Sequence, residues 1–409
     1  MEVKGKFGLL GRTLSHSYSK LIHEKFSLYS YDLFEVEPSC LEGFLSDEKI
    51  CGFNVTIPYK TEIIKYLDYV DEVAKQIGAV NTVVRQGGKL YGYNTDIFGM
   101  QYMLDSAGIE VTDKVVAVLG SGGTSHTAAA LLKGLGAKEI LIVSRTGEIN
   151  YQTIKERQDV QVIINTTPVG MYPETQNSPI DLSGFVNLEA VADVVYNPQK
   201  TKLLYQAERL NIKCTGGLSM LVAQAKRALE IFTDVRFSDD IVRPVLDWLQ
   251  NLSSNVVLIG MPGTGKTQIG KRLAPAIKRK FVDTDELIEK HFGLDIPTVF
   301  ERFGEAEFRR VESMVLAEVC KKGGQVIATG GGIVENQDNH FLLKQNGTIV
   351  YIVRDLEKLS TKNRPLSKDL DHVKGIYERR KDKYAFFADL IVDNNGEINQ
   401  TVKEIIKSL

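Results

Sequence analysis

The pattern of apolar and polar positions predicts strands and helices that alternate along almost the whole chain, which is typical of parallel sheets covered by helices. In the first third, we expect strands at Lys6–Gly11, Tyr31–Glu37, Gly52–Thr56 and Ala79–Val84. Helical periodicity is found at Ser19–Ser30, Tyr59–Leu67, Asp71–Ile77 and Asp96–Ala107. A second set of strands is predicted at Val115–Leu119, Ile140–Val143, Val160–Asn165, Val191–Val195 and Lys213–Thr215, followed by helices at Ser219–Phe232 and Asp239–Leu249.

A boundary is predicted where this pattern starts afresh. Asn251–Asn255 is short, polar and turn-prone, and an apolar strand follows it directly. Further strands are then expected at Val256–Gly260, Phe281–Thr284, Val326–Gly330, Thr348–Val353 and Leu390–Asp393. Since 409 residues exceed one ordinary α/β core, we expect three lobes, the first two belonging to one enzyme.

Composition narrows the class of protein. The charges nearly balance (Lys+Arg 50, Asp+Glu 52), which argues against a dedicated nucleic-acid or membrane-surface binder. The four cysteines are scattered, with no CxxC and no paired spacing. This pattern disfavours a zinc site and favours a reduced compartment. No apolar stretch approaches a membrane span, and the first residues lack a signal-peptide pattern. We expect a cytoplasmic enzyme acting on small molecules, with its oligomeric state left open.

A glycine-rich turn follows the predicted strand Val115–Leu119. Gly120, Gly122 and Gly123 match the start of a dinucleotide fingerprint, although Ser125 occupies its third position. Alone, such a loop also suits plain packing. The next strand ends in Ser144-Arg145-Thr146, where an NAD site would place an acidic residue. Because a cation can pair with a 2′-phosphate, NADP(H) is the better expectation, and a solvated Arg145 is the alternative.

Polar segments upstream of this turn are unusual in composition. Ser17 and Ser19 follow the first strand, and Thr56 and Lys60 leave another strand through a proline. A helix start is an unfavourable place for a cation, so Lys60 must meet some other demand. Further amides and a carboxylate follow at strand ends, in Ala79-Val-Asn81-Thr and Gly92-Tyr-Asn94-Thr-Asp96. Taken singly, each of these segments could be a cap, a turn or an exposed side chain.

Together and in this order, the segments resemble shikimate dehydrogenase over roughly the first 245 residues. The shared marks are HSxS, NVTxPxK, GAxNT, GxNTD, GxGG and the segment Gly217-Leu-Ser-Met220-Leu-Val-Ala-Gln224. The chain departs from the family at Lys20 (usually proline), at Ser144 (often asparagine) and at His126 (often a cation).

The resemblance implies the following roles. Ser17 and Ser19 would bind the substrate carboxylate, and Asn81, Asp96 and Gln224 would hold ring hydroxyls, with Thr56 nearby. Lys60 and Asp96 would form the catalytic pair. The NADP(H) contacts implied are Gly120, Gly122, Gly123, Ser144, Arg145, Thr146, Tyr196, Gly217 and Met220, although core packing is nearly as good an account of Met220.

A second nucleotide motif begins at Gly260, between an apolar strand and a helical segment. Gly260-x4-Gly265-Lys266-Thr267 is the full P-loop pattern. The backbone from Gly263 through Thr264 to Gly265 would cradle ATP phosphates, Lys266 would reach the β/γ oxygens and Thr267 would bind Mg²⁺.

The rest of this region resembles shikimate kinase across residues 254–409. Its marks are FxDxD, GExxFRxxE, ATGGG, RPL and R-x3-Y, while Ser367 departs from the common RPLL motif. The resemblance implies that Asp283 holds Mg²⁺ and that Asp285 orients or deprotonates the accepting hydroxyl. Arg309 and Arg380 would grip the substrate carboxylate, Gly331 and Gly332 would lie against the ring, and Arg364 would come from a lid.

The sequence therefore predicts two α/β enzymes in one chain. A two-lobed dehydrogenase would have its substrate lobe at 1–98 and 217–250 and a Rossmann NADP lobe at 99–216. A linker at 251–255 would lead to a P-loop kinase with a parallel sheet at 256–409. The two would reduce 3-dehydroshikimate and then phosphorylate shikimate. The alternatives are a quinate- or NAD-preferring dehydrogenase joined to another polyol kinase, and a regulatory module that binds its ligands without turnover.

Overall fold

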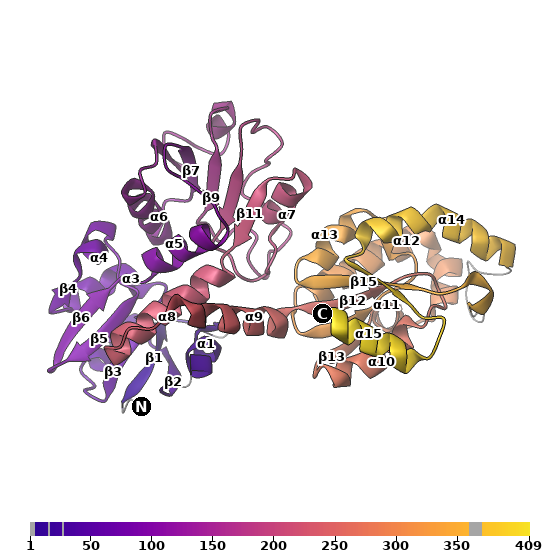
Figure 1. The fold of residues 1–409 in the computed structure, drawn as a ribbon, viewed down its shortest axis with the longest axis horizontal. Coiled ribbons are helices and arrows are strands. Elements are labelled where there is room, and N and C mark those ends of the chain that lie inside the picture. Colours follow the sequence, from indigo (N-terminus) through magenta and orange to yellow (C-terminus); the bar gives the residue numbers. More distant parts are fainter. Residues whose placement is uncertain (1–4, 15–16, 27, 360–369) are drawn as a thin grey trace. The chain divides into compact units, whose positions relative to one another are not determined.

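The chain folds into two compact units, Met1–Gln250 and Asn251–Leu409. The structure is a computed structural model that describes residues 5–14, 17–26, 28–359 and 370–409. Within the described residues there are three sheets, two in the first unit and one in the second, each flanked by helices (Figure 1). The expected α/β class is confirmed.

The first sheet is mixed rather than parallel. Its strands are β1 (Lys6–Gly11), β2 (Tyr31–Glu35), β3 (Ile50–Val55), β4 (Tyr69–Val70), β5 (Thr82–Gln86) and β6 (Lys89–Tyr93), in the order β2-β1-β3-β5-β6-β4. β5 runs antiparallel to both β3 and β6. Around it are α1 (Ser19–Phe26), η1 (Pro38–Cys40), α2 (Leu41–Leu45), α3 (Tyr59–Glu62), η2 (Ile63–Tyr66) and α4 (Glu72–Ile77).

The β5–β6 hairpin is the main difference from the strands expected in this lobe. Gly87 and Gly88 both have positive φ (57° and 80°) and reverse the chain between the two strands. This glycine pair is a recognised hairpin signal that the reading of Ala79–Val84 as one isolated strand overlooked. As a result, Asn81 lies just before β5 and Asp96 just after β6, on neighbouring strands.

The second sheet is fully parallel, with the order β11-β10-β9-β7-β8. Its strands are β7 (Val115–Leu119), β8 (Glu139–Val143), β9 (Val162–Asn165), β10 (Ala190–Asp193) and β11 (Lys213–Gly216). The helical elements are α5 (Asp96–Ser106), α6 (Gly123–Gly134), η3 (Thr153–Glu156) and α7 (Lys202–Arg209). Alternate residues of β7 belong to different core clusters, Val116 and Val118 to one and Ala117 and Leu119 to the other. Both faces of the sheet are therefore buried.

The first unit ends in α8 (Leu218–Thr233), η4 (Asp239–Ile241) and α9 (Val242–Ser253). α8 packs against α5 and carries a buried ion pair, Lys226–Glu230, with an N–O distance of 2.8 Å. The boundary between the two units falls at Gln250/Asn251, where the predicted linker 251–255 begins, but the segment is not a loop throughout, because α9 continues to Ser253 and the next strand begins at Asn255. Polar side chains such as Asn251 are tolerated on the exposed side of a helix, so polarity alone did not mark a loop.

The second unit is built on a parallel sheet in the order β13-β14-β12-β15-β16. Its strands are β12 (Asn255–Ile259), β13 (Lys280–Asp283), β14 (Gln325–Ala328), β15 (Gly347–Val353) and β16 (Leu390–Asp393). Its helical elements are α10 (Lys266–Ala276), α11 (Thr284–Phe292), α12 (Ile296–Cys320), η5 (Ile333–Glu335), α13 (Asp338–Lys344), η6 (Leu356–Lys358), α14 (Leu370–Phe387) and α15 (Ile398–Ser408). α12 is broken at Gly304, where φ is 80°.

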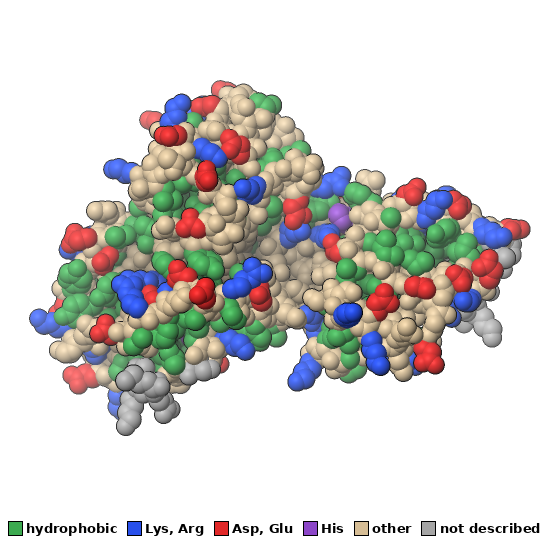
Figure 2. Space-filling view, in the orientation of Figure 1, with side chains coloured by type: hydrophobic (Ala, Val, Ile, Leu, Met, Phe, Trp, Pro, Cys, Tyr) green, Lys and Arg blue, Asp and Glu red, His purple; other side chains and the backbone are tan. Residues whose placement is uncertain are grey.

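Acidic and basic side chains are interspersed over the visible face of each unit (Figure 2). Among the helices in the described ranges, none combines the length and the apolar character that crossing a bilayer requires.

Candidate functional sites

A lysine–carboxylate pair lies between α3 and α5 in the first unit. Lys60 Nζ is 2.7 Å from Asp96 Oδ2, and the two side chains are 27% and 12% exposed. Lys60 comes from the one-turn helix α3, and Asp96 is the first residue of α5. The ion pair explains why a cation occurs where a helix start disfavours it.

Asn81 holds the other oxygen of that carboxylate. Its Nδ2 donates to Asp96 Oδ1 at 2.8 Å, and its own Oδ1 accepts from the Thr95 backbone N–H at 2.7 Å. The second contact fixes which end of the amide faces Asp96. Asp96 therefore accepts a hydrogen bond at each of its two oxygens, one from Asn81 and one from Lys60.

Thr95 connects this group to α8. Its hydroxyl lies 3.3 Å from Gln224 Oε1, while Gln224 Nε2 donates to the Leu221 carbonyl at 2.9 Å. The amide of Gln224 is thereby oriented by a backbone carbonyl, which can only accept. The structure thus brings together Lys60, Asn81, Asp96 and Gln224, which are widely separated in the sequence.

A buried chain of hydrogen bonds supports Asn81 from behind, and its connections were not predicted. Tyr31 Oη donates to Asn54 Oδ1 at 2.7 Å, and Asn54 Nδ2 donates to Thr82 Oγ1 at 3.0 Å. Thr82 Oγ1 in turn donates to Asn81 Oδ1 at 3.1 Å. Asn54 and Thr82 stand inside the NVT and GAxNT segments, but only the pairing of β3 with β5 places them side by side.

The predicted carboxylate-binding serines lie at the start of α1. Ser17 Oγ donates to Ser19 Oγ at 3.1 Å, so the two hydroxyls are close together. Thr56 follows β3, and its backbone N–H donates to the Leu10 carbonyl, which brings it to the end of β1. Tyr196 packs on Tyr18, with ring centroids 5.5 Å apart.

The first glycine turn joins β7 to α6. Gly120 (φ 114°) donates its N–H to the Val143 carbonyl, and a Cβ there would lie 2.8 Å from Thr166 Oγ1. By contrast, a Cβ at Gly122 would meet no described atom within 4 Å, so this backbone is open. Gly123 begins α6, whose first turn (residues 123–126) contains no acidic side chain. An approaching anion therefore meets free space and a helix N-terminus.

The segment after β8 lies beside this turn, because β7 and β8 pair from Val115 to Leu119. Ser144 is half-buried, and Arg145 and Thr146 are exposed. Packing alone requires glycine at position 217, since a Cβ there would lie 2.0 Å from the Val194 carbonyl oxygen. Met220 is buried in the cluster that contains Met100 and Val118, so its packing role is clear.

The P-loop of the second unit joins β12 to α10. Gly263 and Gly265 have φ of 92° and 94°, values that favour glycine. Lys266 Nζ donates to the carbonyls of Gly260 (2.9 Å) and Met261 (3.0 Å). The Thr264 hydroxyl is turned inward and donates to the Met261 carbonyl, so its side chain serves the loop itself.

Carboxylates face the P-loop from the end of β13. Thr267 Oγ1 donates to Asp283 Oδ2 at 2.8 Å, and Asp283 Oδ1 accepts from the Asp285 backbone N–H. Asp285 Oδ1 is buried and has no hydrogen-bond partner in the described structure. Burial, with a contribution from Asp283, raises the pKa of Asp285 well above the usual carboxyl range, and Lys266 partly opposes the shift.

Arg309 is held by carboxylates of its own helix. Its Nη1 lies 2.7 Å from Glu312 Oε2 and its Nη2 lies 3.2 Å from Glu305 Oε1. A Cβ at Gly332 would lie 2.1 Å from the Arg309 guanidinium, so glycine is needed for this approach. Glu312 is nearly fully buried and was missed as a site residue, although its i+3 spacing from Arg309 was visible in the sequence.

Arg380 approaches the same cavity from α14. Its Nε donates to Glu335 at 2.6 Å and its Nη1 donates to the Gly331 carbonyl at 3.0 Å. Tyr384 Oη also donates to the Gly331 carbonyl. Glu335 was not predicted because it belongs to η5, 45 residues from Arg380. Arg364 lies outside the described residues.

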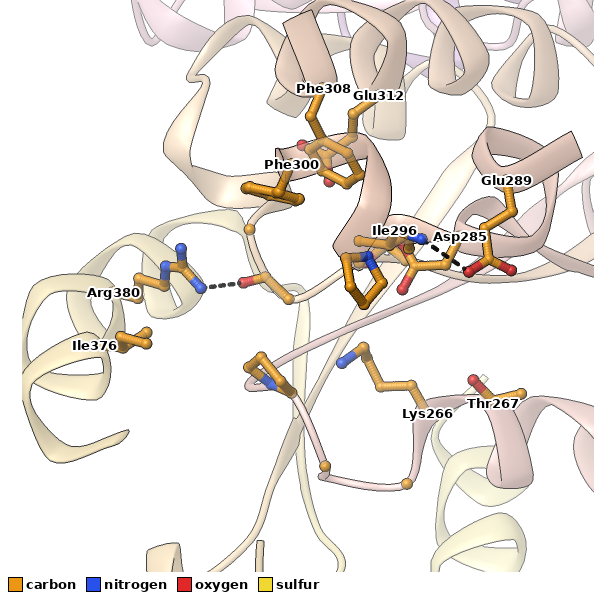
Figure 3. Close-up of a pocket in the computed structure, with 18 of the residues that line it drawn as sticks. Lys266, Thr267, Asp285, Glu289, Ile296, Phe300, Phe308, Glu312, Ile376 and Arg380 are labelled. Carbon is orange, nitrogen blue, oxygen red and sulfur yellow. Dashed lines mark hydrogen bonds between the residues drawn. The ribbon is translucent and has the colours of Figure 1, made fainter. Parts of the chain in front are cut away.

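One cavity of about 870 Å³ is lined by Lys266, Thr267, Asp285, Arg309, Glu312 and Arg380. Lys266 and Thr267 lie along one side, Asp285 across from them, and Arg380 at one end (Figure 3). No group of three or more His, Cys, Asp or Glu within the described ranges has the arrangement of a protein-only metal site. The oxygen ligands Thr267 and Asp283 suit Mg²⁺, which keeps water and phosphate ligands.

Comparison with known proteins finds family models that match each of the two units. The family model of the shikimate dehydrogenase substrate binding domain matches residues 9–83. A shikimate dehydrogenase (NADP(+)) of Clostridium beijerinckii is 36% identical over 266 residues, covering 60% of this chain and 98% of the relative. The chain belongs to the shikimate dehydrogenase family.

Solved structures of this family share the fold of the dehydrogenase part. Shikimate dehydrogenase 1 from Peptoclostridium difficile matches with TM-score 0.56 and 36% identity, covering 60% of this chain and 97% of that one. The enzyme from Thermus thermophilus, solved with NADP(H) and shikimate, matches with TM-score 0.55 and 28% identity, covering 60% of this chain and 99% of that one.

The shikimate kinase family model matches residues 262–409, which lie in the second unit. The chain therefore joins a shikimate dehydrogenase to a second unit that is similar to the shikimate kinase family.

Two glycine substitutions in the dehydrogenase distinguish a glycine needed for NADP(H) binding from a glycine needed for packing. Gly122→Ala should leave the free energy of unfolding unchanged, because its Cβ enters open space, and should weaken NADP(H) binding roughly tenfold, about 1.4 kcal/mol, by obstructing the pyrophosphate. Gly217→Ala should instead lower the unfolding free energy by about 1–3 kcal/mol through the clash with Val194. Calorimetry and NADP(H) titration check both, and equal NADP(H) affinity in Gly122→Ala and wild type would contradict the proposed contact.

Asp285→Asn tests the raised pKa in the kinase. A carboxyl group with a raised folded-state pKa destabilises the fold increasingly as pH rises from its unfolded value, near 4, through its folded value. Asn cannot ionise, so the melting temperature of the variant minus that of wild type should grow between pH 5 and pH 8. Roughly 2–4 °C is expected for each kcal/mol.

Scanning calorimetry of the full chain, without nucleotide or Mg²⁺, measures this difference. Glu286→Gln is the matched control, since Glu286 is the next residue and is exposed. A pH-independent difference for Asp285→Asn would show that Asp285 does not titrate abnormally.

Proposed function

We propose that the dehydrogenase reduces 3-dehydroshikimate to shikimate with NADPH. Hydride transfer to the carbonyl carbon would leave negative charge on its oxygen, which also needs a proton. Lys60 would stabilise that charge and supply the proton, while Asp96 and Asn81 hold the ammonium and the substrate in place. Ser17 and Ser19 would bind the carboxylate, and Thr56 and Gln224 would contact the ring hydroxyls.

The dinucleotide would bind between the two lobes of this enzyme, residues 1–98 with 217–250 and residues 99–216. The open Gly122 backbone and the N-terminus of α6 suit a pyrophosphate, with Gly120 shaping the turn and Gly123 starting the helix. Arg145, flanked by Ser144 and Thr146, suits a 2′-phosphate. Tyr196, Gly217 and Met220 would border the nicotinamide. NADP(H) supplies the hydride chemistry when bound.

The kinase would transfer the γ-phosphoryl group of ATP to the shikimate hydroxyl that the first reaction forms. Gly263, Thr264, Gly265 and Lys266 would bind the phosphates, and Asp285 would orient the hydroxyl and accept its proton. Arg309 and Arg380 would bind the carboxylate, with Gly331 and Gly332 beside the ring and Arg364 neutralising developing charge. Mg²⁺ held by Thr267 and Asp283 would neutralise phosphate charge.

One observation carries the kinase proposal furthest. Asp285, whose Oδ1 lacks a partner among the described residues, lines the same cavity as Lys266, Arg309 and Arg380 (Figure 3). The carboxylate can accept a hydrogen bond from a substrate hydroxyl, and the two guanidinium groups can bind a substrate carboxylate. This combination suits an acidic polyol better than a neutral one. The four cysteines are free thiols, in keeping with the cytoplasmic location that we propose.

A coupled assay tests the two reactions together. Incubation of the protein with 3-dehydroshikimate, NADPH and MgATP should yield shikimate 3-phosphate, identified by mass. Parallel rates with quinate and NAD distinguish the alternative dehydrogenase, and an absence of both turnovers would favour a binding module. If the intermediate accumulates with a lag before phosphorylation, the two sites work independently, which is our expectation.

Lys60→Met should lower the kcat of the dehydrogenase by about 10²–10⁴ while leaving kinase turnover unchanged. The loss follows from removing the proton donor and the partner of Asp96. Lys65→Met is the control, because Lys65 is exposed and its contacts are with its near neighbours Glu62 and Tyr66. Steady-state kinetics checks both variants. Near-wild-type kcat in Lys60→Met would disprove the assignment.

A further inference from the structure

The kinase cavity contains a cation that neither of the family resemblances had marked. Among the described residues, five cationic ones line it, namely Lys266, Arg309, Arg354, Lys358 and Arg380. Lys266 bonds the loop carbonyls, Arg309 pairs with Glu312, Lys358 pairs with Asp355, and Arg380 pairs with Glu335. Arg354 forms no ion pair within the described part of the chain.

The sheet places Arg354 beside the P-loop. β12 and β15 are parallel neighbours, with Ile259 opposite Tyr351. Where β12 ends, Gly260 approaches the Ile352 carbonyl so closely that a Cβ would lie 2.5 Å from it. Arg354 is the first residue after β15, so it leaves the sheet at the level where the P-loop begins.

The Arg354 side chain contains an unsatisfied donor. Its Nε is buried and has no hydrogen-bond partner among the described residues. The carboxylate next in sequence, Asp355, accepts from Lys358 and Asn395, and no hydrogen bond joins it to Arg354 in the described structure. A desolvated guanidinium N–H without an acceptor is unfavourable, and the wall of a nucleotide cavity is a place where a ligand can supply that acceptor.

The identity of the unsatisfied atom selects the ligand chemistry. The Nε–H lies in the guanidinium plane and forms, with one Nη–H, the edge that binds carboxylates and phosphates through two parallel hydrogen bonds. Stacking of the guanidinium on a nucleobase would leave this in-plane donor unsatisfied. An oxyanion in the plane satisfies it, and the adjacent P-loop is where nucleotide phosphates bind.

We propose that Arg354 binds a phosphate oxygen of the kinase's nucleotide through its Nε edge. This proposal rests on the proposed function only as far as the P-loop binds ATP; it does not depend on which hydroxyl is phosphorylated. Arg354 is then a nucleotide-binding residue. It follows β15, which flanks β12 on one side, whereas β14, which is followed by Gly330, flanks β12 on the other side.

Titration of the full chain with ATP and Mg²⁺, by isothermal calorimetry, tests the proposal. Arg354→Met should raise the Kd for ATP about tenfold to hundredfold, as expected when a charge-assisted hydrogen bond is lost. Arg354→Lys should recover only part of that loss, because it restores the charge without the planar edge. The Kd for shikimate alone should stay within about twofold of wild type in both variants.

Arg272→Met is the matched control. Arg272 is an exposed residue of α10 that bonds Asn399, so this variant removes the same charge from the same unit without touching the cavity. It should bind ATP like wild type. The melting temperature of Arg354→Met should not fall, since no ion pair among the described residues is lost, and dehydrogenase turnover in the same chain reports the active protein concentration.

An unchanged Kd for ATP in Arg354→Met would overturn the proposal, as would an equal weakening in Arg272→Met, which would indicate a general charge effect. Full recovery by Arg354→Lys would also overturn it, because the planar edge would then be unnecessary. If wild type binds ATP but does not phosphorylate shikimate, the proposed function fails while this binding test remains valid.

Discussion

Both sites of this protein depend on the rule that a charge removed from water must have a partner. Lys60 is held by Asp96, Arg309 by Glu312, and Arg380 by Glu335, all at contact distances below 3 Å. These pairs orient side chains that are otherwise long and mobile, so the protein itself fixes the positions of the three cations. The same rule makes the exceptions informative, because Asp285 Oδ1, Arg309 Nε, Glu312 Oε1 and Arg354 Nε are buried without partners in the described structure, in residues that line one cavity.

Parallel strand order explains how the kinase site is assembled from distant segments. The ends of β12, β13, β14 and β15 contribute the P-loop, Asp283, Gly330 and Arg354, since carboxyl ends of parallel strands share one sheet edge. The dehydrogenase uses a different device in its first sheet. There the β5–β6 hairpin places Asn81 beside Asp96, and the β3–β5 pairing extends the polar network to Asn54 and Tyr31.

Local sequence patterns predicted some elements closely and missed others, and each outcome has a physical reason. Strands buried on both faces, such as β7 and β12, read as continuous apolar runs and were predicted closely. The hairpin at Gly87-Gly88 was overlooked, and the polar stretch at Asn251 was expected to be a turn although α9 continues to Ser253; the boundary between the two units nevertheless falls there. Polarity reports solvent exposure, which the outer face of a helix shares with a loop. Glu335 and Tyr31 were missed because their partners lie far away in the chain.

The sequence by itself determined the α/β class, the two nucleotide loops and the residue types that each chemistry needs, since strand periodicity and glycine-rich turns are local properties of the chain. Only the tertiary structure decided which of those residues meet. It connected Asn81 through Thr82 and Asn54 to Tyr31, gave Arg380 its partner Glu335, and left Arg354 Nε without a described partner beside the P-loop. Such outcomes depend on strand order and burial, which determine both the distance between two charges and whether water remains to solvate them.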